Sequence, residues 1–413
     1  MWRPGARAGG LAAAILLAAP FVASARAEEN FDLQPYQLVR SLELVQDRLA
    51  GGDEAAFPMQ RKLLEMIDAK LLATPAKTFD DERNFDALLV YAISGGNPST
   101  IETVVSRLDL KPPRAALGAG VLGYVRGRPA EAEKALHGID PLTQPTELGA
   151  YLALLEGSVA AAEDSEAALK FFDAARLLGP GSLVEEAALR RSVMIALKMR
   201  DPDRFLDYSE QYVRRFLRSP YASQFADGFV VGVVDMHSSI DLDRVARTLG
   251  EMDADRRKAI YLRLARKSAI EGLADLTAFA SRMADVRNDP RSKTNDPRVL
   301  LYSSIASVAS GSVGAVATQL ASIDRTRLSE SDQRLLDAAR TIAGEVIAQP
   351  KAPDVPAKVA EAAAAGNASS NPAEKKPAPP AGPDEKAMDA SMKIMADTRQ
   401  KLAAIDELLK ETE

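Results

Sequence analysis

The residues that most often carry chemistry in proteins are few in this chain and lie far apart. The 413 residues include two histidines, His137 and His237, and no cysteine. Neither histidine has a second ligand at the spacing of a zinc motif such as H-x-x-x-H or H-E-x-x-H. Without cysteine the chain has no disulfide, thiolate metal site or thiol nucleophile. A lone histidine is typical of a structural or surface position, so we predict no metal site.

Carboxylates are plentiful, but none lies in a complete catalytic motif. Glu330-Ser331 is the nearest match to the Glu-Ser pair of lytic enzymes that cleave peptidoglycan from a compact C-terminal lobe. The aromatic and glycine-rich elements around such a site are missing, so we interpret Glu330 as an acid at a helix start. The runs Glu185-Glu186 and Asp80-Asp81-Glu82 are interpreted in the same way, as charges at helix N-termini.

Nucleophile and nucleotide motifs are also missing from the sequence. No G-x-S-x-G elbow, phosphate-binding glycine loop or dinucleotide fingerprint occurs. Gly118-Ala119-Gly120 lies within a helical pattern and does not follow a strand, so it does not form a nucleotide loop. The two-lobed α/β pattern of a periplasmic ligand-binding protein is not visible either. The prediction is a protein without catalytic residues or cofactor, and not an enzyme.

The first residues have the pattern of a secretory signal. Arg3 and Arg7 form the basic region, Leu11 to Val22 is the apolar run, and Ala25-Arg26-Ala27 is a small-x-small cleavage site. A membrane anchor is the alternative, but an apolar run of this length is well short of the roughly 20 residues that span a bilayer. We expect cleavage between Ala27 and Glu28 and an exported mature chain without stable membrane insertion.

The charge balance argues against nucleic acid as a partner. The chain carries 52 basic and 58 acidic residues, and removal of residues 1–27 would remove three arginines and no acid. Nucleic-acid-binding proteins concentrate positive charge, so an acidic chain of this kind is expected to bind other partners.

The segment from Leu117 to Asp140 predicts the architecture, because it reads as two helices joined at Gly127. Apolar residues recur at helical spacing on both sides of this glycine. Glycine suits the left-handed residue that ends a helix, and Pro129 suits the first turn of the next helix. Small residues such as Gly120 and Ala132 would let the two helices approach closely. The sequence therefore predicts a helical hairpin here.

Related hairpins recur along the chain. The pattern G-x8-[LV]-x2-[LI]-D begins at Gly96, Gly127 and Gly311. Between them lie residues at the consensus offsets of a tetratricopeptide repeat (TPR), namely Leu152, Leu155, Ala168, Phe172, Ala175 and Pro180, with the usual glycine one place late at Gly157. The next unit, Leu183 to Pro220, is longer. An all-α, irregular TPR-like helical-hairpin solenoid is predicted, with an irregular helical domain as the alternative.

Three further segments complete the predicted secondary structure of the helical part. Asn30 to Leu72 should form two helices that break at Gly51-Gly52, and Thr74 to Arg83 a loop. Met59, Leu63, Leu64, Ile67 and Leu71 should line one stripe of the second helix. Phe225 to Met236 is rich in β-branched residues, but we interpret it as a buried helix because it lies among helices.

Composition divides the mature chain into three parts. Residues 28–349 are the predicted helical domain, and 350–384 are a disordered linker rich in Pro, Ala and Lys. Residues 385–413 form a predicted amphipathic helix with coiled-coil character. Its apolar face, the candidate partner-binding face, consists of Met388, Met392, Met395, Leu402, Ile405 and Leu409. This helix could fold back on the helical domain or dock on a partner, and the pattern leaves both open.

The N-terminal part resembles the motility protein C (MotC) family of rhizobial flagellar motors. The resemblance is carried by Pro35 to Leu42 (PYQLVRSL), Leu44 to Arg48 (LVQDR) and Met59 to Asp68 (MQRKLLEMID), and again by Arg399 to Leu409 (RQKLAAIDELL). These motifs are structural in type and contain no catalytic signature. The likeness covers most of the chain that would remain after signal cleavage.

The resemblance implies a function that the residues alone do not. Proteins of this family are periplasmic, are needed for flagellar rotation, and associate with the periplasmic part of the stator subunit MotB. A dedicated periplasmic chaperone is a further implied partner. The alternative function is a general periplasmic TPR-like adaptor in cell-envelope assembly, to which the fold prediction would apply equally.

Overall fold

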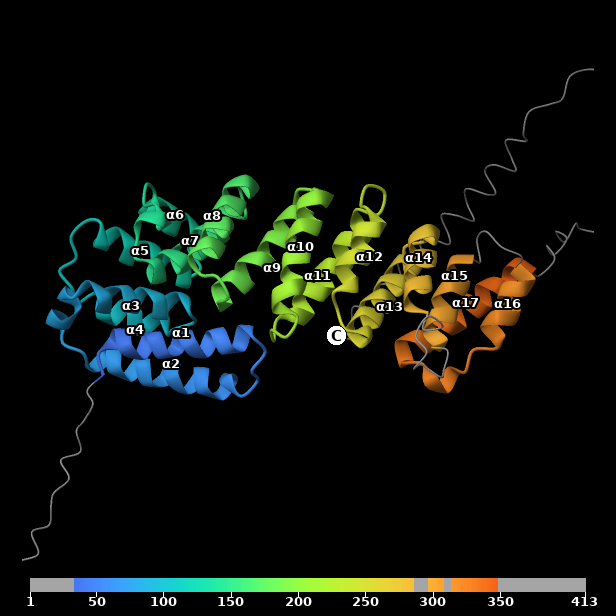
Figure 1. Cartoon of the computed structure of the whole chain (residues 1–413), viewed down its shortest axis with the longest axis horizontal. Coiled ribbons are helices and arrows are strands. Elements are labelled where there is room, and N and C mark those ends of the chain that lie inside the picture. The colour runs from blue at the N-terminus through green and yellow to red at the C-terminus, as the bar shows by residue number, and fades with distance from the viewer. Residues whose placement is uncertain (1–32, 286–295, 308–312, 348–413) are drawn as a thin grey trace, which may run out of the picture. The chain divides into compact units, whose positions relative to one another are not determined.

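The protein folds into helices throughout the part that its computed structural model describes, residues 33–285, 296–307 and 313–347 (Figure 1). No strand occurs in these ranges, which confirms the all-α fold class. The N-terminal helices are α1 (Pro35–Ala50), α2 (Ala56–Ala73), α3 (Glu82–Ile93), α4 (Pro98–Val105), α5 (Arg114–Val125), α6 (Pro129–Leu136), α7 (Thr146–Ala160) and α8 (Ser165–Leu178). The others are α9 (Leu183–Lys198), α10 (Pro202–Phe216), α11 (Ala222–Asp235), α12 (Leu242–Gly250), α13 (Ala254–Ile270), α14 (Ala274–Ala284), α15 (Pro297–Ser307), α16 (Val313–Ala321) and α17 (Glu330–Ile347).

Polar residues and prolines set many of the helix starts. A side-chain oxygen at the N-cap accepts a backbone N–H of the first turn, which satisfies a donor that has no partner inside the helix. The caps of this kind are Asp81, Asn97, Asp164, Ser182, Asp201, Asp241 and Asp253. Proline in the first turn, where its missing N–H costs nothing, starts α1, α4, α6 and α10.

Helices that follow each other in the chain pack as hairpins, and the hairpins pack side by side. The pairs α5–α6, α7–α8, α9–α10 and α13–α14 are in close contact. The first helices of successive hairpins also contact one another, from α7 to α9, α11, α13 and α15 in turn. The predicted solenoid-like order of hairpins is therefore present.

Arginines link equivalent helices of neighbouring hairpins. Arg190 of α9 donates to Gln224 of α11, and Arg263 of α13 pairs with Asp227 of α11. On the second helices, Arg176 of α8 donates to Gln211 of α10. These partners are 34 to 36 residues apart in the sequence, about the length of one TPR unit. The first helices of these hairpins begin at residues 146, 183, 222, 254 and 297, so the hairpins recur at irregular intervals of 32 to 43 residues.

The α7–α8 hairpin carries the TPR-like pattern. Leu152, Leu155, Ala168, Phe172 and Ala175 are all fully buried, as the consensus offsets predict. A β-carbon at Gly157 would lie 2.6 Å from the Phe172 ring, so this position admits no side chain. The displaced glycine is thus explained by the packing of α7 on α8.

The α5–α6 hairpin forms at the predicted place. Gly127 between the helices has φ +70°, in the left-handed region, and Pro129 begins α6. Gly120 lies against the next helix, because a β-carbon there would be 2.4 Å from Leu136 Cγ. Close helix approach through small residues is confirmed. Gly311, the start of the third copy of the repeat pattern, lies outside the described residues.

Two details of the sequence prediction are wrong. Thr74 to Arg83 is not an open loop, because it contains a 3-10 helix (η1, Ala76–Asp80) and the start of α3. The α2 stripe is also incomplete: Ile67 and Leu71 are buried, but Met59 is exposed. The helical interpretation of Phe225 to Met236 is confirmed by α11.

Helix α1 runs across several hairpins in addition to packing on α2. The buried side chain of Gln46 accepts a hydrogen bond of 3.1 Å from the hydroxyl of Tyr151 in α7. Asp47, the next residue of α1, accepts the backbone N–H of Leu183, the first residue of α9, through its Oδ1. At the end of α1, Gly52 lies against Arg218, in the turn before α11. Helix α1 is therefore a brace for α7, α9 and the turn after α10.

Candidate interaction surfaces

The histidines and Glu330 lie on the surface and do not meet at a site. His137 is exposed at the C-cap of α6, and His237 Nδ1 lies 2.9 Å from the carbonyl oxygen of Val234, one turn before it. Glu330 is the exposed first residue of α17, as the helix-start interpretation predicts. Across the described ranges, no group of three or more potential ligands could hold a metal ion. No described helix is long and apolar enough to cross a membrane.

The two runs of acidic residues at helix starts differ in burial, which the sequence did not predict. Asp81 caps α3, as expected for a charge at a helix start. Glu185 and Glu186 also lie in the first turn of α9, but both are buried. Glu186 accepts hydrogen bonds from Tyr212 and Arg190, and Glu185 accepts from Arg215. The one sequence signal for burial was Arg190, four residues after Glu186, which allows an ion pair within the helix.

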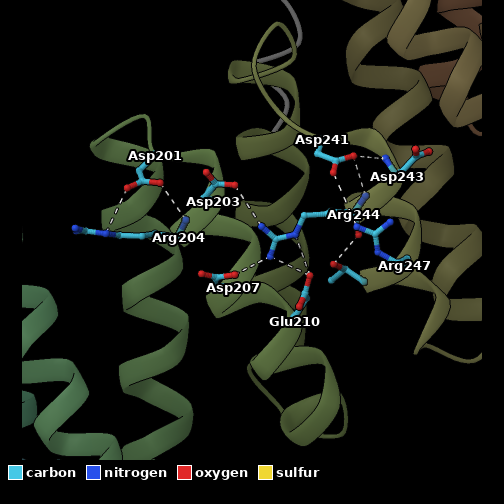
Figure 2. A network of polar contacts seen from close by, with 10 residues as sticks. Asp201, Asp203, Arg204, Asp207, Glu210, Asp241, Asp243, Arg244 and Arg247 are labelled. Atoms are coloured by element: carbon cyan, nitrogen blue, oxygen red, sulfur yellow. Dashed lines mark hydrogen bonds and ion pairs between the residues drawn. The ribbon is translucent and has the colours of Figure 1, made fainter.

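An arginine of α12 binds three carboxylates of α10 (Figure 2). Arg244 Nη2 lies 2.7 Å from Asp207 and 3.1 Å from Glu210, and Nη1 lies 3.4 Å from Asp203. The three acids are spaced four and three residues apart, so they share one face of α10. The hydrogen bonds that Arg244 donates to Asp207 and Glu210 raise the pKa of its guanidinium. One cation against three anions leaves this surface acidic.

A groove opens where the brace helix α1 meets the start of α7 and the α8–α9 turn, and we call it the α1–α7 groove. Its volume is about 280 Å³. The lining residues are Arg40, Glu43, Leu44 and Asp47 of α1, Thr146, Glu147, Ala150 and Tyr151 of α7, and Leu178, Gly179, Pro180, Ser182 and Val184 of the turn region. The groove thus combines apolar and acidic surface, and three separate segments of the chain form it.

Three acidic side chains, Glu43, Asp47 and Glu147, line this groove. Burial raises the pKa of Glu43 to about 7, with further contributions from Glu147 and Asp47, while Arg40 acts in the opposite direction. Burial also raises the pKa of Asp47, against the hydrogen bond from Leu183. Sequence reasoning missed the groove, because Glu43 and Glu147 are more than a hundred residues apart and no local pattern relates them.

The structure does not test the site residues named from the sequence. The cleavage pair Ala27 and Glu28 is outside the described residues, as is the candidate partner-binding face of Met388, Met392, Met395, Leu402, Ile405 and Leu409. The domain limits at residues 27, 349 and 384 likewise stay predictions.

Two comparisons with known proteins identify the same family. The family model described as "Chemotaxis protein MotC" matches residues 3–413. A chemotaxis protein MotC of Rhizobium meliloti (strain 1021) is 37% identical over 353 residues, which cover 84% of this chain and 81% of that protein. No solved structure matches the chain.

Proposed function

The chain belongs to the chemotaxis protein MotC family, and from this premise we propose that it is a non-enzymatic accessory protein of the flagellar motor. The observation that carries the proposal is the family match, which extends over residues 3–413. The family connects the chain with chemotaxis and motility. The finer proposal is that the protein acts in the periplasm and supports flagellar rotation by associating with the periplasmic part of the stator subunit MotB.

The fold supports a role in protein association. Rows of helical hairpins present extended surfaces, and repeat proteins of this architecture commonly use them to bind other proteins. The described surfaces include the acidic Arg244 network and the α1–α7 groove, which a basic partner region would complement. These extended and acidic surfaces support binding of another protein as the role of the helical domain.

Export is the second part of the proposal, and it is supported by the secretory signal in the sequence. The one tryptophan of the chain is Trp2, so cleavage before Glu28 would leave a protein with tyrosine emission only. Periplasmic protein whose intact mass still includes residues 1–27 would contradict processing at this position.

The C-terminal segment is the third part. We propose that its apolar face, Met388 to Leu409, docks on the stator subunit and adds to a main contact made by the helical domain. A tethered second contact raises affinity through local concentration, without any change in the main contact.

A pull-down with the purified periplasmic region of MotB tests the association directly. We expect the exported protein to bind this region, and a deletion strain to assemble normal flagella that do not rotate. A general envelope adaptor would instead leave rotation intact and weaken the envelope. Normal swimming of the deletion strain, or absence of binding by correctly folded protein, would refute the motor role.

A further inference from the structure

The α1–α7 groove holds three carboxyl groups and one cation. Glu43, Asp47 and Glu147 face a single base, Arg40, and no ion pair joins any of these acids to another described residue. This differs from the acids on neighbouring helices, where Arg190 pairs with Glu186 and Arg204 with Glu166. The groove is therefore a place where a cation from another molecule would relieve the repulsion between the acids.

The same groove has an apolar side. Leu44 is 61% exposed, although it lies on the otherwise well-packed helix α1. Ala150, Leu178 and Val184 also line the groove. A long side chain with an aliphatic stem and a cationic end would match both surfaces, and arginine suits carboxylates better than lysine because its planar guanidinium donates two parallel hydrogen bonds.

The groove walls are fixed to one another. Tyr151 of α7 is hydrogen-bonded to Gln46 of α1, and Asp47 of α1 accepts the N–H of Leu183 at the start of α9. A groove held in this way is formed before any ligand arrives, which lowers the cost of binding. Its volume of about 280 Å³ is enough for one or two side chains of an extended segment.

We propose that the α1–α7 groove docks an arginine-bearing, extended segment of a partner protein, with the guanidinium facing Glu43 and Glu147 and an apolar neighbour against Leu44. The inference rests on the proposed function for its partner, the periplasmic region of the stator subunit. It adds the surface of this chain that takes part and the chemistry that the partner must supply.

Binding at the groove is linked to pH. The pKa of Glu43 is raised to about 7 by burial and by Glu147 and Asp47, so most of its charge is lost at pH 6 and most is present at pH 8. A cation binds the charged form better, and affinity should therefore increase from pH 6 to pH 8. Glutamine at position 43 would remove the contribution of this group to the increase.

The first test measures binding of the stator periplasmic region to wild type and to the double variant Glu43→Gln with Glu147→Gln, at pH 6 and pH 8. The matched control is Glu133→Gln with Glu163→Gln, which changes the same charge at two exposed positions outside the groove. At pH 8 we expect binding by the groove variant to be at least about fivefold weaker, with the control unchanged and the pH effect reduced. If wild type binds and the groove variant binds equally well, the groove inference is wrong and the proposed function stands.

A second probe makes the result independent of the stator subunit. The peptide acetyl-Ala-Leu-Arg-Leu-Ala-amide is titrated against wild type and groove variant, with a control peptide that carries neutral citrulline in place of arginine. Stronger binding of the arginine peptide to wild type alone supports the groove even if the stator region does not bind. Absence of binding, or equal binding by both peptides or both proteins, overturns the inference.

Discussion

The hydroxyl of Tyr212 on α10 donates a hydrogen bond of 2.7 Å to Oε1 of Glu186 on α9. Both side chains are fully buried, and Arg190 Nε lies 3.2 Å from the same carboxylate oxygen. The Tyr212 ring also stacks on Phe225 of α11, with ring centres 4.2 Å apart. A buried carboxylate is costly unless charge and hydrogen bonds compensate it. Tyr212 therefore stabilises Glu186 of α9 through its hydroxyl and contacts α11 through its ring.

Replacement of Tyr212 by phenylalanine should therefore destabilise the protein by about 1–3 kcal/mol, because the ring is kept but Glu186 loses a buried donor. Urea unfolding followed by circular dichroism measures the effect. The control is Tyr124→Phe, where the hydroxyl of a half-buried tyrosine has no hydrogen bond to a described residue. Equal unfolding midpoints for Tyr212→Phe and wild type would show that Arg190 alone satisfies the carboxylate.

The turn at Gly127 allows a test of the hairpin. Its φ of +70° strains any residue with a β-branched side chain, although no atom lies within 4 Å of the β-carbon position. Gly127→Val should thus cost about 1–2 kcal/mol or more, while Gly127→Asn should cost less because asparagine tolerates left-handed backbone. Because space is available, the difference between the variants reports backbone strain alone. Identical thermal unfolding of both variants and wild type would contradict this account.

The Arg244 network predicts a salt-dependent contribution to stability. Arg244→Leu leaves Asp203, Asp207 and Glu210 facing one another on α10, and should lower the free energy of unfolding by about 1–2 kcal/mol at low salt. The loss should shrink in 1 M salt, where charges are screened over a few ångströms. Arg247→Leu on the same helix is the control, since its nearest acid, Asp241, is 3.9 Å away and its side chain is largely exposed. Equal effects of the two variants would exclude a special role for Arg244.

Glu156 on α7 predicts a pH dependence of stability. Burial, with a contribution from Asp140, raises its pKa to about 8, and its Oε1 has no hydrogen-bond partner among the described residues. The folded chain keeps this proton up to about pH 8, whereas an unfolded glutamate loses it near pH 4.5. Unfolding between these values releases a proton, so this group makes the free energy of unfolding fall as pH rises from 4.5 to 8.

Glu156→Gln carries no titrating proton and should not show this fall. The variant should match wild type near pH 5 and exceed its stability by about 1–3 kcal/mol at pH 8. Unfolding midpoints in urea at several pH values measure the difference, and Glu163→Gln, at an exposed position close by, is the control. Parallel pH profiles for wild type and Glu156→Gln would disprove the assignment.

Local sequence patterns predicted those parts of the fold that depend on neighbouring residues. Gly127 and Pro129 define a hairpin by their own backbone preferences, and the buried set from Leu152 to Ala175 follows from helical spacing. The all-α class could be predicted for the same reason, because many helices carry their own caps or N-terminal prolines together with an apolar stripe.

Local patterns could not predict contacts between segments that are distant in the sequence. The contact between Gln46 and Tyr151 joins residues 105 positions apart, and periodicity does not say which hairpins α1 crosses. Glu185 and Glu186 look like ordinary helix-start acids, and they are buried only because α10 supplies Tyr212 and Arg215. The α1–α7 groove has the same origin, since its acids come together only through the position of α1.

The last prediction concerns the C-terminal segment, whose role remains a proposal from its sequence. If residues 385–413 form a tethered docking helix, their deletion should leave the unfolding temperature nearly unchanged and weaken capture of the stator periplasmic region. Leu402→Asp with Ile405→Asp should have the same effect, because charge on the apolar face prevents its burial in a partner groove. Lys401→Asp is the control on the polar face. A truncated protein that unfolds would show that the segment belongs to the helical domain, and one that binds and supports swimming normally would show that it is dispensable.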